Sequence, residues 1–342
     1  MTAPRSVWLL ASVLALGAAV SLHGQERPSG QGFSFRSSTN LINVTVTVTD
    51  ANGRFVPGLR RDDFEIYEDG VKQDVQQFDS DRVPVSLGIV LDTSGSMAGP
   101  RIQAAQAALN RFLFDLLGKQ DEVFLYRFDS RPELVHSWTT DRAAVSRALG
   151  AINPRGGTAL YDSVAEAVPL AQRGTQRKKA LVIISDGDDT NSHLTVRDAQ
   201  QIIRNSELLV YAIAIDPGAS PRTSAPAAPA APSKPVPSPF PGRKPSAPTT
   251  PPPTANATRS GPATAGTMAL RLLTDDSGGR TEVIGSHQDL DPATAGIADE
   301  LSRQYFLGYV SASPKDGRWH AIEVRLRRGN YHVRSRSGYN AG

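Results

Sequence analysis

The sequence of 342 residues contains no cysteine. This absence excludes disulfide bonds, a thiolate nucleophile, zinc sites built on thiolates and a lipid anchor on cysteine. The charge balance is nearly even, with 37 Lys and Arg against 34 Asp and Glu, and the formal net charge is +3. So small an excess does not indicate nucleic-acid binding, and neither a zinc-finger spacing nor interleaved basic and aromatic residues support it. We therefore expect no nucleic-acid partner.

Long apolar runs are also missing, apart from one near the N-terminus. Val7–Val20 carries no charge, follows Arg5 and contains the small residues Ala18 and Ala19 near its end. This pattern is typical of a secretory signal peptide. The run is shorter than the about twenty apolar residues that a membrane-spanning helix needs. We predict a signal peptide over residues 1–24, export to the periplasm or the medium, and no membrane span in the mature chain. An uncleaved signal anchor is the alternative.

Proline is scarce except in one segment. Fifteen of the 25 prolines lie between Pro217 and Pro262, where Ala, Ser and Thr supply most of the remaining residues. Such a composition cannot bury enough apolar surface to offset the entropy lost on ordering. We predict that residues 217–262 form a disordered or extended insert. It is either a neutral surface loop or a segment that regulates access to a neighbouring site.

Residues 25–82 and 305–342 show the apolar–polar alternation of half-buried strands. The alternating segments are Leu41–Asp50, Phe64–Glu68, Val71–Phe78, Tyr305–Val310, His320–Arg327 and His332–Arg336. Asp69-Gly70 is a strong hairpin signal between the second and the third of them. Neither group of strands is long enough to form a stable sheet stack alone. We expect the two groups to pair in one small antiparallel β module.

Between residues 83 and 304, apolar strands alternate with helical patterns, which indicates an α/β domain with a doubly wound, mostly parallel sheet inserted in the β module. The expected strands are 85–91, 122–128, 134–138, 180–185, 208–215 and 280–284, and the expected helices are 101–117, 143–152, 158–173, 196–206 and 292–303. If the strand order is 3-2-1-4-5-6, the first strand neighbours the fourth. Ligands of such sheets bind beyond the carboxyl ends of the strands at this point.

Oxygen-bearing side chains follow these two strands. The strand 85–91 runs into Asp92-Thr93-Ser94-Gly95-Ser96, which places one carboxylate and two hydroxyls on one turn. Asp186 follows the strand 180–185, and Thr158 opens a helix after two glycines. Carboxylate and hydroxyl oxygens are ligands that suit Mg²⁺. A turn that only caps the following helix is the alternative for the first loop, but capping alone does not explain all three loops.

These residues resemble a von Willebrand factor type A domain with a complete metal-ion-dependent adhesion site. Asp92, Ser94 and Ser96 match its Asp-x-Ser-x-Ser loop, Thr158 matches the threonine of its second loop, and Asp186 the aspartate of its third. The resemblance covers roughly residues 83–304. It implies a Mg²⁺ or Mn²⁺ ion bound directly by the hydroxyls and through water by some of the aspartates. It also implies that an acidic side chain of a partner protein completes the coordination.

A second resemblance covers almost the whole mature chain. The opening Val48-Thr49-Asp50, the run from Asp63 to Gly70 and the C-terminal strands are similar to the VWFA-related domain proteins described from Acidobacteria. This resemblance implies a bacterial protein, and it says little about activity.

We therefore expect a non-enzymatic, adhesion-type binding protein that docks an Asp or Glu of a partner protein through its metal. Two alternatives remain open: a metal-dependent hydrolase, and a structural envelope component whose metal only stabilises the fold. A hydrolase needs a general base near Asp92, and only Asp188 and Asp189 are candidates; otherwise these two are solvated loop acids. The serines lack a Gly-x-Ser-x-Gly elbow, and the histidines, including His320, lack paired ligand spacing.

Overall fold

The computed structural model of the chain describes residues 40–216 and 264–341. The predicted signal peptide and the predicted proline-rich insert lie outside these residues. Among the described helices, none combines the length and the apolar character that crossing a membrane requires.

The middle of the chain forms a six-stranded sheet with the order β10-β9-β8-β5-β6-β7. Neighbouring strands are parallel, except that β7 runs antiparallel to β6 at one edge. The strands are β5 (Val85–Asp92), β6 (Glu122–Phe128), β7 (Pro132–Thr139), β8 (Lys178–Ser185), β9 (Leu209–Ile215) and β10 (Thr281–Ile284). This order is the predicted 3-2-1-4-5-6, and the doubly wound, mostly parallel sheet is confirmed. The first strand, β5, therefore pairs with the fourth, β8.

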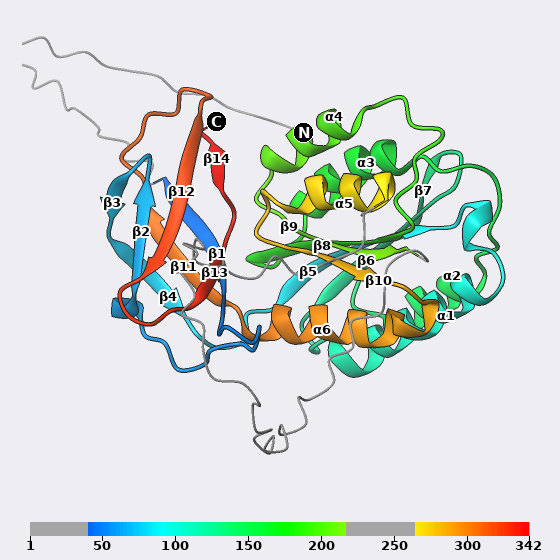
Figure 1. Cartoon of the computed structure of the whole chain (residues 1–342), viewed down its shortest axis with the longest axis horizontal. Coiled ribbons are helices and arrows are strands. Elements are labelled where there is room, and N and C mark those ends of the chain that lie inside the picture. Colours follow the sequence, from blue (N-terminus) through cyan, green and yellow to red (C-terminus); the bar gives the residue numbers. More distant parts are fainter. Residues whose placement is uncertain (1–39, 217–263, 342) are drawn as a thin grey trace, which may run out of the picture. The chain divides into compact units, whose positions relative to one another are not determined.

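Helices cover both faces of this sheet, as Figure 1 shows. One face packs against α1 (Pro100–Arg111), α2 (Arg142–Gly150) and α6 (Leu290–Arg303), and the other against α3 (Leu160–Gln172), α4 (Val196–Arg204) and α5 (Ala265–Thr274). All eight residues of β5 are buried. Burial on both faces explains why the central strands are continuous apolar runs without alternation.

Two helical details differ from the prediction. The predicted helix 101–117 is α-helical only to Arg111, and Phe112–Leu116 continues as a π-helical turn. No sequence pattern predicted α5, which follows the proline-rich insert. The side chain of Thr264 caps this helix by accepting a hydrogen bond from the backbone N–H of Thr267, and Leu270 and Leu273 are buried. A helix of ten residues gives too short a periodic pattern to stand out beside low-complexity sequence.

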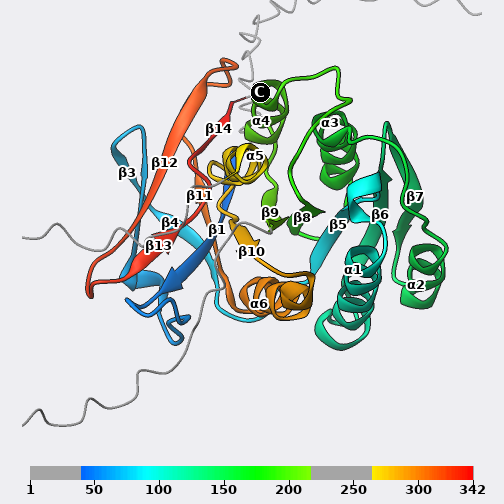
Figure 2. The same cartoon turned by 45° about the vertical axis from the view of Figure 1, so that its right-hand side comes forward.

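The segments that flank the α/β domain pair with each other, and the accessory antiparallel module is confirmed. Two four-stranded sheets pack against each other (Figure 2) and have the orders β13-β1-β11-β4 and β14-β12-β2-β3. Their buried side chains form one apolar core. The strands are β1 (Leu41–Thr49), β2 (Phe64–Glu68), β3 (Val71–Gln73), β4 (Val75–Asp79), β11 (Tyr305–Val310), β12 (Trp319–Leu326), β13 (His332–Arg334) and β14 (Gly338–Asn340). Because β1 pairs with β11 and β2 with β12, each sheet combines strands from both ends of the described chain.

The hairpin at Asp69-Gly70 is confirmed, but the strand after it is not continuous. Asp69 has φ 48° and Gly70 has φ 80°, the left-handed pair that a tight two-residue hairpin requires. The predicted strand 71–78 is wrong because the chain changes sheets at Asp74. Its first part, β3, pairs with β2, and its second part, β4, pairs with β11 of the other sheet.

A polar cluster around Glu300 of α6 joins the β module to the α/β domain. The Glu300 carboxylate accepts hydrogen bonds from Arg280 Nε (2.9 Å), Tyr211 Oη (2.8 Å) and Thr47 Oγ1 (3.2 Å), and it pairs with Arg334. Burial opposes the charge of Glu300, but the two arginines hold its pKa below the usual value. Thr47 comes from β1 and Arg334 from β13, so their contacts with Glu300 link the β module to the α/β domain.

Candidate metal centre

Asp92 lies at the carboxyl end of β5 and is fully buried. Its Oδ1 accepts a hydrogen bond from the backbone N–H of Ser94 (2.8 Å), and its Oδ2 accepts one from Ser185 Oγ (2.6 Å). These two contacts fix the carboxylate between the first loop and the end of β8. Burial raises the pKa of Asp92 to about 6, and the nearby Asp186 contributes to the shift. A buried carboxylate of this kind favours a cation beside it.

The two serines of the first loop face each other. Ser94 Oγ lies 3.0 Å from Ser96 Oγ, and Ser94 is buried whereas Ser96 is exposed. Neither hydroxyl caps a helix: the short turn Gly95–Met97 receives no side-chain cap from Ser94, and α1 begins after Gly99, which has φ +73°. The capping explanation of this Asp-x-Ser-x-Ser turn therefore does not describe its hydroxyls.

Backbone hydrogen bonds tie the three predicted loops together. The N–H of Gly95 donates to the carbonyl of Gly156 (3.0 Å), which links the first loop to the second. The carbonyl of Thr158 accepts hydrogen bonds from the N–H groups of Thr190 and Asn191 (2.9 Å each), which links the second loop to the third. Thr158 itself is 5% exposed and precedes α3 by two residues. The loops that carry all five predicted residues thus meet beyond β5 and β8.

Asp186 is the least satisfied member of this group. Its Oδ1 is buried and has no hydrogen-bond partner, and its Oδ2 lies 3.7 Å from Arg101 Nη1. The next residue, Gly187, has φ +83°, and a Cβ there would come within 2.4 Å of the Gly266 carbonyl oxygen. Only glycine fits this turn against α5. The close packing fixes the backbone on which the Asp186 carboxylate is carried.

The structure corrects one interpretation of the acids that follow Asp186. Asp189 is not a free solvated acid: its Oδ1 accepts hydrogen bonds from the N–H of Leu160 (2.8 Å) and from Ser192 Oγ (2.6 Å). The carboxylate therefore accepts a hydrogen bond from an N–H group that has no partner within α3. Its negative charge is also favourable at the positive end of that helix. Asp188, in contrast, is exposed.

The five residues fit a hard divalent cation. They offer carboxylate and hydroxyl oxygens and no nitrogen or sulfur, which is a ligand set of the kind that Mg²⁺ and Mn²⁺ prefer. The buried, unpartnered Asp186 Oδ1 is the observation of this structure that fits a bound ion best, because an unsatisfied buried carboxylate oxygen is costly. Ser94 Oγ and Ser96 Oγ, which lie 3.0 Å apart, offer two neutral oxygen ligands.

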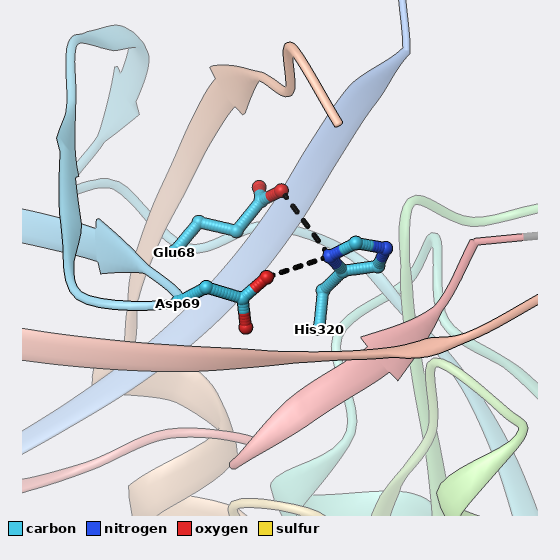
Figure 3. A group of neighbouring side chains, drawn as sticks. All are labelled: Glu68, Asp69 and His320. Atoms are coloured by element: carbon cyan, nitrogen blue, oxygen red, sulfur yellow. Dashed lines mark hydrogen bonds and ion pairs between the residues drawn. The ribbon is translucent and has the colours of Figure 1, made fainter. Parts of the chain in front are cut away.

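A different group of titratable residues lies in the β module, where no motif of the sequence predicted a site. Glu68, Asp69 and His320 come together where β12 passes the β2–β3 hairpin (Figure 3). His320 Nδ1 lies 2.7 Å from Asp69 Oδ2 and 3.9 Å from Glu68 Oε1. His320 is therefore a buried residue of an ion-pair cluster and not a surface histidine. The only sequence signal was the acidic pair at the hairpin, because the pairing of β12 with β2 brings the histidine there.

Two carboxylates and an imidazole this close together could hold a metal ion, but several of their atoms are already engaged within the protein. Glu68 Oε1 accepts hydrogen bonds from the hydroxyls of Ser311 (2.7 Å), Ser313 and Tyr339 (3.2 Å). The hydrogen bond to Asp69 raises the pKa of His320, which favours the imidazolium form that cannot bind a metal through Nδ1. The cluster forms an ion pair that fastens the hairpin to β12. Glu68 Oε2 and His320 Nε2 are buried in it without a hydrogen-bond partner, and His320 Nε2 lies 3.5 Å from Asp316 Oδ1.

Residues 87–188 match the family model of the von Willebrand factor type A domain. The chain is 29% identical over 111 residues to an uncharacterised protein of Synechocystis, a match that covers 32% of this chain and 26% of the relative. It is also 29% identical over 137 residues to the human inter-alpha-trypsin inhibitor heavy chain H4, covering 36% of this chain and 14% of the relative. The chain thus spans about a quarter or less of these relatives.

Among solved structures, a von Willebrand factor type A protein of Catenulispora acidiphila is 13% identical with a TM-score of 0.47, covering 90% of this chain and 74% of that one. The vWF domain of the type V pili tip protein Mfa5 from Porphyromonas gingivalis is 26% identical with a TM-score of 0.31, covering 34% and 44%. The family match over residues 87–188 falls on the strands and loops that carry the candidate metal centre. This part of the chain is a von Willebrand factor type A domain.

Proposed function

We propose that this chain is an exported binding protein whose type A domain holds Mg²⁺ or Mn²⁺ and docks an acidic residue of a partner protein. The family often mediates protein–protein adhesion through such a metal site. The residues that would hold the ion are Asp92, Ser94, Ser96, Thr158 and Asp186. The observation that carries the proposal is the buried Asp186 Oδ1 without a partner, at the point where the three loops are hydrogen bonded together.

Each side chain has a defined part in this arrangement. Asp92 is held by Ser94 N–H and Ser185 Oγ, so its charge stays at the base of the site without reorganisation. Ser94 and Ser96 present neutral oxygens, and Asp186 supplies the second charge. When bound, the ion supplies positive charge and a coordination position for a carboxylate oxygen of the partner. Two carboxylates do not saturate a hexacoordinate cation, which leaves room for that oxygen.

Binding is favoured over catalysis because one of the two candidate general bases is already engaged in hydrogen bonds. Asp189, one of the two candidates, caps α3, and the other, Asp188, is exposed. Ser94 Oγ lies 3.0 Å from Ser96 Oγ. The hydrolase therefore remains the weaker candidate. The export part of the proposal rests on the sequence pattern of residues 1–24.

Thermal unfolding in Mg²⁺ and in EDTA tests the metal site. Binding to the folded state alone stabilises by about 2.7 kcal/mol at a hundredfold excess over Kd, which for a chain of this size raises the melting temperature by about 5–10 °C. Asp186→Ala and Thr158→Ala should reduce or abolish the rise. Asp188→Ala, which removes the adjacent exposed acid, is the matched control and should retain it. A wild-type curve that is the same in Mg²⁺ and in EDTA contradicts the site.

The partner is sought by cross-linking in Mg²⁺ and in EDTA, followed by mass spectrometry. Docking through the ion predicts proteins that are captured only in Mg²⁺ and lost with Thr158→Ala. If the wild type and Thr158→Ala capture the same proteins equally, while Thr158→Ala loses the effect of Mg²⁺ on melting, the structural alternative is supported. Mg²⁺-dependent turnover of phosphate ester, peptide or glycoside substrates, lost with Asp92→Ala, supports the hydrolase.

A further inference from the structure

Arg101 reaches from the first turn of α1 back over the metal loops. Its Nη1 donates a hydrogen bond to the carbonyl oxygen of Ser96 (3.0 Å) and lies 3.7 Å from Asp186 Oδ2. The side chain is 30% exposed. The guanidinium is therefore anchored at the rim of the centre by one donor, while its planar fork carries further N–H donors for another group.

The charge of the centre depends on this arginine. Asp92 and Asp186 together carry two negative charges, which a divalent ion neutralises without surplus. Arg101 then adds one positive charge beside Asp186. The neighbouring acids are partly offset or screened: Asp129 pairs with Arg127 (3.1 Å), Asp189 faces the partial positive charge at the start of α3, and Asp188 is exposed to solvent. Without Arg101 the loaded centre would have no net charge with which to attract an anion.

We propose that Arg101 is the second anchor for the partner's carboxylate and thereby selects Asp or Glu over neutral oxygen ligands. The inference rests on the proposed function and names the residue that gives it specificity. A carboxylate has two oxygens, so the oxygen that does not go to the ion is available to the guanidinium fork. Charge-assisted hydrogen bonds of this type are stronger and more directional than neutral ones.

The same position has an opposite effect on the ion. A guanidinium 3.7 Å from Asp186 competes with a cation for that carboxylate. Removing the charge should therefore tighten Mg²⁺ binding while it weakens carboxylate binding. If Arg101 had only a structural role, its replacement would not change the two affinities in opposite directions. Loss of folding would weaken the binding of Mg²⁺ and of the carboxylate together.

The experiment compares wild type, Arg101→Gln and Arg101→Lys in the full chain. Mg²⁺ affinity is measured by titration calorimetry. Carboxylate affinity is measured by titrating N-acetyl-aspartate amide into Mg²⁺-saturated protein and following the amide NMR signals of the first loop. N-acetyl-asparagine amide is the neutral probe. Arg155→Gln is the matched control, because Arg155 is an exposed rim arginine 3.6 Å from Asp129 and makes no contact with Asp186 that the structure records.

We expect Arg101→Gln to bind Mg²⁺ about threefold more tightly and the aspartate probe about tenfold more weakly, with little change for the neutral probe. Arg101→Lys keeps the charge but not the planar fork of the guanidinium. Its affinities for Mg²⁺ and for the aspartate probe should therefore lie between those of the wild type and of Arg101→Gln. Unchanged aspartate affinity in an Arg101→Gln protein that binds Mg²⁺ overturns the inference and leaves the proposed function standing. Equal losses in Arg155→Gln also overturn it. A wild type that does not bind Mg²⁺ overturns the proposed function, and this inference with it.

Discussion

Lys178 offers a quantitative test of how the α/β domain is joined to its last helix. The residue opens β8, is 1% exposed, and its Nζ donates a hydrogen bond to the carbonyl oxygen of Leu301 (2.7 Å) near the end of α6. It thus satisfies one of the carbonyls that a helix leaves unpaired at its C-terminus. Burial, helped by the charge of Arg82, lowers the pKa of Lys178 to about 8 from 10.5.

This shift makes stability depend on pH in a defined direction. Between the folded pKa of about 8 and the unfolded value of 10.5, the unfolded chain binds more protons than the folded one, so unfolding becomes more costly as pH rises. Below pH 8 both states carry the proton, and the folded state bears the full cost of a buried ammonium. From about pH 7 to about pH 9.5 the contribution to the free energy of unfolding should grow by about 2 kcal/mol.

Lys178→Met removes the titrating group and retains an apolar side chain of similar length. Urea unfolding of wild type and variant at about pH 7 and about pH 9.5 gives the free-energy difference at each pH. The loss of the Leu301 hydrogen bond contributes equally at both, so the wild type should gain about 2 kcal/mol over the variant between them. Lys179→Met, at the half-buried next position, controls for loss of a charge. A difference between wild type and Lys178→Met that is the same at both pH values refutes the reasoning.

The remaining predictions concern the His320 cluster and the proline-rich segment. Because the hydrogen bond to Asp69 raises the pKa of His320, the ion pair stabilises fully below the unfolded histidine pKa of about 6.5, and this stabilisation is lost as pH rises through the folded value. His320→Gln should therefore destabilise the protein more at about pH 6 than at about pH 9, as denaturant unfolding measures; a larger cost at the higher pH would contradict it. Replacing residues 217–263 by a short Gly/Ser linker should change stability by no more than about 1 kcal/mol, because Thr264 Oγ1 already donates to Asp216 Oδ2 (3.0 Å) across the ends of the segment. Loss of cooperative melting in that variant would show that the segment supplies structure.

The sequence was sufficient for features that depend on local pattern. Apolar runs predicted β5 and β8, and the rule for strand order in doubly wound sheets placed their carboxyl ends side by side. The five candidate ligands follow from the same reasoning, because each stands just beyond a strand or just before a helix. Their role as metal ligands stays a prediction. The Asp69-Gly70 hairpin was also readable, since few residue pairs adopt two left-handed conformations.

Features that depend on distant pairing were not readable. His320 becomes buried because β12 lies beside β2, and nothing within the sequence around it signals Asp69 as its partner. Arg334 of β13 pairs with Glu300 of α6, and no local pattern in the sequence signals this contact. Asp189 was predicted to be a solvated loop acid. Its hydrogen-bond donor at the start of α3 lies about thirty residues earlier in the sequence, beyond the reach of a local pattern. In each case tertiary contacts, and not local propensity, decide the role.

The pairing of β1 has a consequence for the order in which the protein is synthesised. This strand, LINVTVTVT, carries no charge and is rich in β-branched residues, a composition that favours strand addition by other chains. Both of its neighbours, β11 and β13, lie beyond residue 304. A ribosome therefore completes the whole type A domain before either partner of β1 exists, and the α/β sheet can fold while β1 still has two open edges. The nascent chain therefore exposes an uncharged, β-branched strand for the longest time, and this is the segment that a chaperone acting during synthesis would need to cover.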